Sequence, residues 1–472
     1  MLTWDLYRKW LGSTLLSGNF PQASCPDISA WSTDTRSITR GEWFVPIVGA
    51  SYDGHRFIAE ALSKGAQGFF YVPDHCADLP QGLLASGIPV RDTLEAFQNI
   101  ASGWRQSLSN LTLAALTGSS GKTTTKELLG LALKASGNTF ATQASFNNEV
   151  GVPKTLQQLS PDHVYAAVEF GARMPGNIAF LCELGHPNVA GLLNVGSAHL
   201  GIFGSFENLL NTKLEIFRNS PSNAILVPFA DDRRILEGAL STGKRILSFG
   251  YSKTADVRIL DAKWLNATEG MTVDLTYDGK VSHLKFTVAH EMLPQNAAAA
   301  MAMALACGAP RARIEEGIVR FQGVKGRYQI HTLEHITLID DTYNANPASV
   351  AAGFQTLRKS FPNRDKILIL GDMLELGDDS AAEHHRIGIL AAQSLSPSLL
   401  VTVGHDAKYI AEGAHSSGME KSRILSFASV DELLRERLDY ASFGDVVYAK
   451  GSNGIRLSKV VDAMLEKIGA KR

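Results

Sequence analysis

Short apolar runs alternate with polar turns and longer mixed segments along most of the chain. In the middle of the chain these runs have the length of strands, and they cover residues 111–116, 164–168, 189–195, 225–228 and 245–249. A strand that is buried on both faces reads as a continuous apolar run, and strands that alternate with helices build a parallel sheet. The pattern therefore predicts an α/β protein with a doubly wound parallel sheet at its centre.

Changes in this pattern divide the chain into three predicted domains. Residues 1–105 combine short strands, short helices and polar turns, which predicts a small α/β domain. Residues 106–323 hold the central sheet and add an alternating stretch around Asp278-Gly279, a turn pair typical of an antiparallel hairpin. Residues 324–472 repeat the alternation of strands and helices, so we expect a Rossmann-like C-terminal domain there.

Some single elements are predicted by the same reasoning. In the first domain we expect a strand at 42–47 and a helix at 55–65. In the central domain an alanine-rich helix is expected at 297–307, and a helix that contains Lys213 is expected to begin near Phe206.

The stretch LTLAALTGSSGKTTT, residues 111–125, reads as a strand, a glycine turn and the start of a helix. In the turn, small residues leave space for backbone N–H groups to surround a phosphate, and the helix directs its positive end at the same anion. Lys122 adds a positive charge, and Thr123 adds a hydroxyl of the kind that binds Mg²⁺ in phosphate-binding loops. The candidate nucleotide-binding residues are Gly118, Ser119, Ser120, Gly121, Lys122, Thr123 and Thr124.

One position of the general phosphate-loop pattern is missing, because Leu116 stands where a glycine is expected five residues before Gly121. The shorter GxxGKT core that remains also occurs at ordinary helix starts. The strand before the turn and the helix after it favour nucleotide phosphate binding over a chance glycine turn.

Two further polar residues follow predicted strands of the central sheet. Glu169 follows the strand at 164–168, and His199 follows the strand at 189–195. Each alone is typical of an ordinary loop residue. Ligands of doubly wound sheets collect at the carboxyl ends of the strands, so the phosphate loop at the same edge makes both residues candidate Mg²⁺ ligands.

Composition narrows the class of protein. The chain has 472 residues, 45% of them apolar, and a formal charge of −2, which argues against a general nucleic-acid binder. The four cysteines form no CxxC pair, so neither a disulfide framework nor a zinc site is expected. Without a signal sequence or a membrane-length apolar segment, we expect a cytoplasmic protein that does not insert into membranes.

These motifs resemble the Mur ligase superfamily, the ATP-dependent amide-forming enzymes of peptidoglycan precursor synthesis. TGSSGKTTTKE fits the superfamily, as do Glu169, His199, Lys213, Asn296, Arg327 and Asp341. Longer stretches are similar to the members that add D-alanyl-D-alanine to UDP-N-acetylmuramoyl-tripeptide; these are residues 145–153, 169–176, 340–347, 371–377 and 450–452. The chain departs from this pattern at Val48-Gly49, where a lysine is common, at Gln295, where histidine is more frequent, and at Asn453, where arginine is expected.

The resemblance implies a reaction and its cofactors. ATP would phosphorylate the terminal carboxylate of the UDP-tripeptide, and the dipeptide amine would then displace phosphate from the acyl phosphate. Lys122, Glu169, His199 and Lys213 would be catalytic, and Thr123, Glu169, His199 and Lys213 would bind Mg²⁺. In the superfamily a lysine at the position of Lys213 can carry a carbamate; an ordinary solvated helix lysine is the alternative.

The resemblance also assigns binding residues. Asn296 would face the adenine, while Arg327 and Asp341 would reach the phosphates and ribose after closure of the third domain. Thr35, Arg36, Asp53 and His55 would hold the UDP-sugar. Asn344, Asn346 and Lys450 would contact the dipeptide, although Asn-Ala-Asn-Pro is equally a good turn sequence.

Other functions compatible with the motifs remain open at this point. They are a related ligase that adds a single amino acid, a folylpolyglutamate synthetase, a nucleotide-binding scaffold without catalysis, and a phosphoryl-transfer kinase. We expect small-molecule substrates, no nucleic-acid partner and a monomer.

Overall fold

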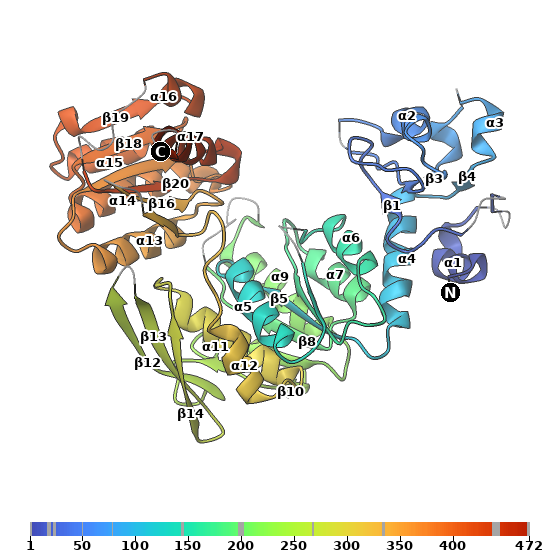
Figure 1. Ribbon diagram of the computed structural model, residues 1–472, viewed down its shortest axis with the longest axis horizontal. Coiled ribbons are helices and arrows are strands. Elements are labelled where there is room, and N and C mark those ends of the chain that lie inside the picture. Colours follow the sequence, from blue (N-terminus) through green and yellow to red (C-terminus); the bar gives the residue numbers. More distant parts are fainter. Residues whose placement is uncertain are drawn as a thin grey trace.

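Four sheets in three spatial groups build the molecule. The computed structural model describes residues 2–16, 20–21, 25–49, 51–77, 79–142, 146–196, 203–266, 269–332, 336–436 and 444–469. In Figure 1 the N-terminal group lies at the upper right, the C-terminal group at the upper left, and the central group below and between them. The predicted α/β class is confirmed. The exact domain boundaries stay predictions. Helix α4 (Thr93–Ser107) extends across the boundary predicted at residue 105.

The N-terminal group is a parallel sheet of four short strands with helices around it. The strands pair in the order β1-β2-β3-β4. They are β1 (Trp31–Ser32), β2 (Trp43–Phe44), β3 (Gly68–Tyr71) and β4 (Gly87–Pro89). The helices besides α4 are α1 (Trp4–Leu11), α2 (Ile58–Ser63) and α3 (Gln81–Leu84), with 3₁₀ turns η1 (Gly12–Thr14), η2 (Gly54–Phe57) and η3 (Pro73–His75).

Two expected elements of this group are shorter than predicted. The strand expected at 42–47 is only Trp43–Phe44, since Pro46 has no N–H to donate to a ladder. The helix expected at 55–65 is divided into η2 and α2. Tryptophan and other aromatic side chains fill the core beside the sheet, with Trp43 and Phe70 fully buried.

The central group contains the predicted doubly wound parallel sheet, in the order β10-β9-β8-β5-β7-β6. Its strands are β5 (Thr112–Thr117), β6 (Thr139–Ala141), β7 (Tyr165–Glu169), β8 (Val189–Leu192), β9 (Ile225–Pro228) and β10 (Arg245–Ile246). The helices beside this sheet are α5 (Lys122–Lys134), α6 (Gly151–Gln157), α7 (Asn177–Gly185), α9 (Phe206–Arg218) and α10 (Arg233–Leu240). The chain leaves β5 for β6 and β7 on one side and returns to β8 on the other, so the carboxyl end of β5 is a switch point where ligands bind in such sheets.

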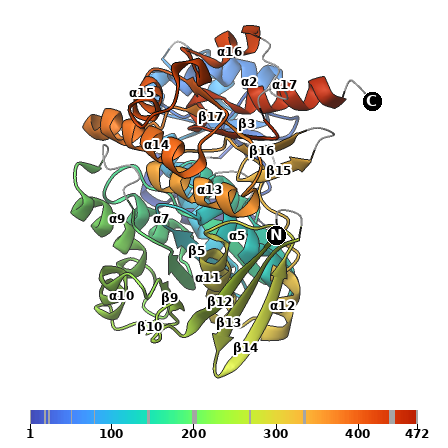
Figure 2. The same cartoon turned by 90° about the vertical axis from the view of Figure 1, so that its left-hand side faces the viewer.

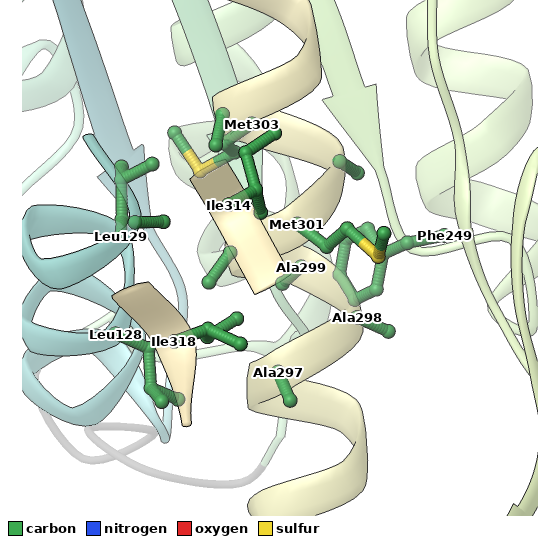
Figure 3. Packing of buried hydrophobic residues seen from close by; sticks show 14 of the residues in the cluster. Leu128, Leu129, Phe249, Ala297, Ala298, Ala299, Met301, Met303, Ile314 and Ile318 are labelled. Carbon is green, nitrogen blue, oxygen red and sulfur yellow. The ribbon is translucent and has the colours of Figure 1, made fainter. Parts of the chain in front are cut away.

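A second, mostly antiparallel sheet packs beside the central one. It is formed by β11 (Phe249–Gly250), β12 (Val257–Asn266), β13 (Gly270–Tyr277) and β14 (Lys280–Phe286), followed by α11 (Leu293–Ala306) and α12 (Arg311–Ile318). The predicted hairpin is confirmed, because Tyr277 pairs with Lys280 and both Asp278 and Gly279 have positive φ. Figure 3 shows the buried alanine and methionine side chains of α11 packed with Leu128 and Leu129 of α5 and with Ile314 and Ile318 of α12.

The C-terminal group is a six-stranded sheet in the order β15-β16-β20-β17-β18-β19, parallel except for β15. The strands are β15 (Gln329–Thr332), β16 (Thr337–Asp341), β17 (Lys366–Gly371), β18 (Leu399–Val403), β19 (Ile424–Phe427) and β20 (Val446–Lys450). The helices are α13 (Pro347–Ser360), α14 (Ser380–Leu395), α15 (Lys408–Ser416), α16 (Val430–Glu436) and α17 (Ser458–Gly469). Figure 2 shows the C-terminal group above the central group, and α13 contacts β12 of the antiparallel sheet.

None of the helices in the described ranges combines the length and the apolar character needed to cross a lipid bilayer.

Candidate functional site

The glycine turn after β5 has a backbone that only glycine adopts easily. Gly121 has φ +80°, and a Cβ atom there would lie 2.4 Å from Oδ1 of Asn296. Helix α5 begins directly after it at Lys122. Lys122 folds back over the turn and donates from Nζ to the carbonyl of Gly118 at 2.8 Å. The turn and the first turn of α5 together have the geometry that favours a bound anion, and binding of a phosphate there stays a prediction.

Asn194, just after β8, holds the turn from the side. It accepts from the Ser120 amide at 2.9 Å through Oδ1 and from the Ser119 amide at 3.1 Å through its carbonyl. The sequence predicts that these two amides face a phosphate, whereas the structure uses them to fix the turn. The N–H groups left for an anion are those of the first turn of α5, which have no partner within the helix. Sequence reasoning missed Asn194, because it placed this residue inside the strand expected at 189–195, whereas β8 ends at Leu192.

Thr123 and Glu169 lie side by side at the carboxyl edge of the sheet. Thr123 Oγ1 donates to Glu169 Oε2 at 2.9 Å, and Asn147 Nδ2 donates to Glu169 Oε1 at 2.8 Å. Burial alone would raise the pKa of Glu169, but Lys122, Asn147 and Arg327 together hold that pKa below its usual range. A buried carboxylate beside a hydroxyl is a suitable donor set for Mg²⁺. The sequence analysis did not single out Asn147 as a site residue, although Asn147 lies in the stretch 145–153 that carries part of the family resemblance.

Lys213 lies on α9 at the same edge, with its side chain 2% exposed. Burial lowers its pKa to about 7, and the neighbouring charge of Lys122 acts in the same direction. The alternative of an ordinary solvated helix lysine is therefore wrong. An amine with a pKa near 7 has a substantial neutral fraction at neutral pH, and the neutral amine is a nucleophile that can add CO₂.

A cavity of about 980 Å³ lies between the central and C-terminal groups. Its lining contains most of the predicted site residues, namely Ser119, Ser120, Gly121, Lys122, Thr124, Glu169, Lys213, Asn296, Arg327, Asp341, Asn344, Asn346 and Lys450. Gly118 and Thr123 lie just behind this lining, at hydrogen-bond distance from Lys122 and Glu169 respectively. His199 lies outside the described residues.

Arg327 reaches this site from the C-terminal group. Its Nη2 donates to Thr123 Oγ1 at 2.8 Å, and its guanidinium stacks on the Tyr343 ring at 4.2 Å. Its Nε is buried and has no hydrogen-bond partner among the described residues, so the guanidinium retains a donor for a further acceptor. The residues fit a bound nucleoside triphosphate, because a buried unsatisfied donor, Lys122 and the start of α5 all face one cavity.

The other predicted site residues of the C-terminal group form hydrogen bonds and an ion pair within that group. Asp341 accepts from Tyr448 Oη at 2.8 Å and pairs with Lys450 Nζ at 2.9 Å, and Lys450 also donates to the carbonyl of Asn344. Asn346 is the N-cap of α13, with Oδ1 accepting from the Ser349 amide in a capping box. The structure therefore gives Asn346 the turn role that the sequence left open, although the residue also lines the cavity.

The predicted UDP-sugar residues of the N-terminal group do not line this cavity. Thr35 is buried, and Arg36 is exposed and paired with Asp34 at 2.7 Å. His55 is 2% exposed, and its side chain bonds to Asp53 and to the Val72 amide. Both ring nitrogens of His55 are used within the chain in this arrangement, and its contact with the UDP-sugar stays a prediction.

Asp53, His55 and His75 also form the one cluster of metal-ligand type among the described residues. His55 Nε2 accepts from the Val72 amide at 3.1 Å, so the proton of the neutral ring is on Nδ1, 2.6 Å from Asp53 Oδ1. A metal at Nδ1 would require the lone pair that this proton occupies. The cluster is thus a hydrogen-bonded structural unit that ties Asp53 and His55 to the Val72 amide and to His75. The Nδ1 atom of His75 lies 2.6 Å from Asp53 Oδ2.

The four cysteines are free, with Cys76 and Cys182 buried and Cys25 and Cys307 partly exposed. The absence of disulfides that the sequence predicted is therefore confirmed for all four.

Comparison with known proteins supports the same site. Residues 116–304 match the Mur ligase middle domain, and residues 326–453 match the Mur ligase glutamate ligase domain. A UDP-N-acetylmuramoyl-tripeptide–D-alanyl-D-alanine ligase from Synechocystis sp. is 33% identical, over 92% of this chain and 91% of the relative. The crystal structure of MurF from Acinetobacter baumannii superposes with a TM-score of 0.85 at 31% identity, covering 98% of both chains. MurF from Thermotoga maritima in complex with ADP superposes with a TM-score of 0.79 at 26% identity, covering 95% of this chain and all of that one.

Two family models together match most of the chain. Relatives above 30% identity cover nearly its whole length. Both findings support the family to which the motifs of the phosphate loop point. The chain belongs to the Mur ligase family, and within that family it groups with the MurF enzymes.

Proposed function

We propose that this protein joins D-alanyl-D-alanine to UDP-N-acetylmuramoyl-tripeptide with ATP as the energy source, through an acyl phosphate. The observation that carries this proposal is one cavity in which the phosphate loop and Glu169 meet Arg327 from the opposite group. The relatives bear the name of this reaction, and one MurF structure was obtained with ADP. We propose a cytoplasmic location, where ATP is supplied.

The residues of the cavity suit the charge that builds up during phosphoryl transfer. Lys122 and the first-turn amides of α5 would bind the β- and γ-phosphates, and Arg327 would bind the γ-phosphate through its unpartnered Nε. Asn296 is 4% exposed against the glycine turn, where it would contact the nucleotide. These groups are fixed before the reaction and therefore need little reorganisation during it.

Thr123, Glu169 and Lys213 are the described residues that would hold Mg²⁺. When bound, Mg²⁺ supplies charge neutralisation between the phosphates and the attacking carboxylate. Thr123 and Glu169 offer oxygen atoms already. Lys213 would offer oxygen only as a carbamate, and its lowered pKa supports that role because the neutral amine is the form that reacts. His199 stays a predicted ligand.

The substrates would approach from the two outer groups. In the N-terminal group, Asp34 lies two residues after the end of β1, and the charge of Lys154 on α6 adds to the effect of Arg36 in lowering the Asp34 pKa to about 2. Lys154 of the central group is thus near enough to Asp34 to affect its charge, and this proximity supports binding of the UDP-sugar by Thr35, Arg36 and Asp53 beside the central group. Asn344, Asn346 and Lys450, on the other side of the cavity, would meet the dipeptide.

A direct test supplies the purified protein with ATP, Mg²⁺, UDP-N-acetylmuramoyl-tripeptide and D-alanyl-D-alanine. We expect release of ADP and phosphate and an amide product by mass spectrometry, both abolished by EDTA. Replacing the dipeptide with D-alanine or diaminopimelate should give no product. A stable phosphorylated product, a preference for a single amino acid, or nucleotide binding without ADP release would each contradict the proposal.

Replacement of Arg327 by lysine should lower kcat by about 10²-fold, the usual effect of losing one donor to developing charge. Lysine keeps the charge but loses the planar fork that bonds to Thr123 and stacks on Tyr343. Arg313→Lys on α12 is a matched control, because Arg313 is exposed and its side chain pairs with Glu316 on the same helix. Steady-state kinetics with saturating substrates provide the measurement, and equal kcat values for the two variants would contradict the role given to Arg327.

A further inference from the structure

Lys126 is a charged residue with no access to solvent. It lies on α5, one turn after Lys122 and Thr123, and its exposed fraction is 0%. Its Nζ donates to the backbone carbonyl of Thr142 and pairs with Glu127 Oε1 at 2.9 Å. Burial of an ammonium group costs free energy even when it is paired, and a well-packed apolar side chain is often at least as stable. Fold stability alone therefore gives no reason for a lysine here.

Thr142, which accepts the hydrogen bond of Lys126, is itself bonded to β7, the strand that carries Glu169. Thr142 follows β6 and bonds twice to the carbonyl of Ala167 on β7, from its amide at 3.1 Å and from Oγ1 at 3.3 Å. Ala167 lies two residues before Glu169, so it is on the same face of β7 as that residue. Lys126, Thr142 and Ala167 thus connect α5 with the end of β7.

The two sides of the predicted Mg²⁺ site lie on these same two elements. Thr123 is on the first turn of α5, and Glu169 is the last residue of β7, with 2.9 Å between Thr123 Oγ1 and Glu169 Oε2. The helix also packs closely on β6, where a Cβ atom on Gly130 would lie 3.1 Å from Cβ of Ala141. The position of α5 relative to β7 therefore decides how far apart the two oxygens are.

We propose that Lys126 is a positioning residue that fixes the distance between Thr123 and Glu169, and through it the binding of the divalent cation with ATP. This inference rests on the proposed function, because it assigns a cation to that pair. An alternative role for Lys126, a direct electrostatic effect on the phosphates, is weakened by Glu127, whose carboxylate pairs with Lys126 and offsets its charge.

The test measures cation binding without the ligase reaction. Mn²⁺ is titrated by electron paramagnetic resonance into the full-length protein with a non-hydrolysable ATP analogue, for the unsubstituted chain and for Lys126→Met. We expect the Mn²⁺ Kd to rise at least fivefold in Lys126→Met and to return to within about twofold in Lys126→Arg, which keeps a donor and a charge. Hydrogen exchange should become faster in peptides that cover 139–142 and 165–169.

Lys366→Met provides a matched control. Lys366 is also buried, 6% exposed, and donates from Nζ to the carbonyl of Arg364, but it lies in the C-terminal group at the amino end of β17. Its replacement should lower Tm and leave the Mn²⁺ Kd unchanged. If Lys126→Met does not fold, Lys126→Gln, which keeps an uncharged donor, takes its place.

An unchanged Mn²⁺ Kd in the folded Lys126 variant, with only a lower Tm, would overturn the positioning role and leave the proposed function intact. A failure of the unsubstituted protein to bind Mn²⁺ in the presence of the nucleotide analogue would instead contradict the proposed function.

Discussion

Lys122→Met should lower kcat by about 10³-fold or more, since loss of a preorganised cation at a transferring phosphoryl group has effects of this size. Lys122 Nζ lies over the glycine turn, 2.8 Å from the Gly118 carbonyl, and both burial and Arg327 lower its pKa. Its ammonium group would be stabilised again by the phosphates of bound ATP. We therefore expect weaker nucleotide binding together with the lower kcat.

Lys134→Met on the same helix is the control for this substitution. Lys134 is exposed in the last turn of α5, far from the glycine turn, and interacts there with the negative end of the helix dipole. It should retain full activity. Isothermal titration with ATP and product formation under saturating substrates measure both variants. Peptide-bond synthesis within tenfold of the unsubstituted protein in Lys122→Met would contradict the assignment of the phosphate loop.

Lys213→Met should lower activity by about 10²-fold or more, the size expected when a ligand or support of a catalytic metal is lost. A methionine cannot form a carbamate, and arginine should not restore activity because its guanidinium stays protonated. With ¹³C-bicarbonate, the unsubstituted protein should show a carbamate carbon signal by NMR that Lys213→Met lacks. Activity within twofold of the unsubstituted protein would contradict this role.

The same variant should not lose stability. In the folded protein the pKa of Lys213 is about 7, well below its usual value, so the unfolded chain binds more protons between pH 7 and the ordinary lysine pKa. Stability of the unsubstituted protein in this window therefore rises with pH, and the cost of the buried amine is largest near and below pH 7. The Tm of Lys213→Met relative to the unsubstituted protein should accordingly be higher at pH 7 than at pH 9, measured without added bicarbonate.

Lys244→Met is the control that separates the loss of activity in Lys213→Met from a general destabilisation of helix α9. Lys244 Nζ donates to the carbonyls of Phe217 and Ser220 at the end of that helix, outside the cavity. Loss of these bonds should lower Tm and leave kcat unchanged.

Local sequence patterns determined much of the architecture. Most parallel strands of the central sheet, the phosphate turn between β5 and α5 and the hairpin at Asp278-Gly279 follow from apolar runs and turn residues that act over a few neighbours. The sequence did not predict β6, and the run expected at 245–249 divides into β10 and β11 of two different sheets. The position of Glu169 at the carboxyl edge follows from the same patterns, because the ends of parallel strands meet at one edge. Lys213 lies on a helix, and its place at the site was predicted from the resemblance alone. The resemblance to Mur ligases, which the comparisons confirm, rested on motifs of this local kind.

Only the tertiary structure decided which of these groups contact one another. Arg327 bonds to Thr123 across 204 positions of the chain, and Asn194 takes two turn amides that the sequence had left for the phosphate. His55 is buried behind Asp53, and Lys126 is joined to the strand of Glu169. These contacts depend on how whole elements pack, and the energy of a hydrogen bond depends on the distance and angle that this packing sets. No local pattern of residues contains that information.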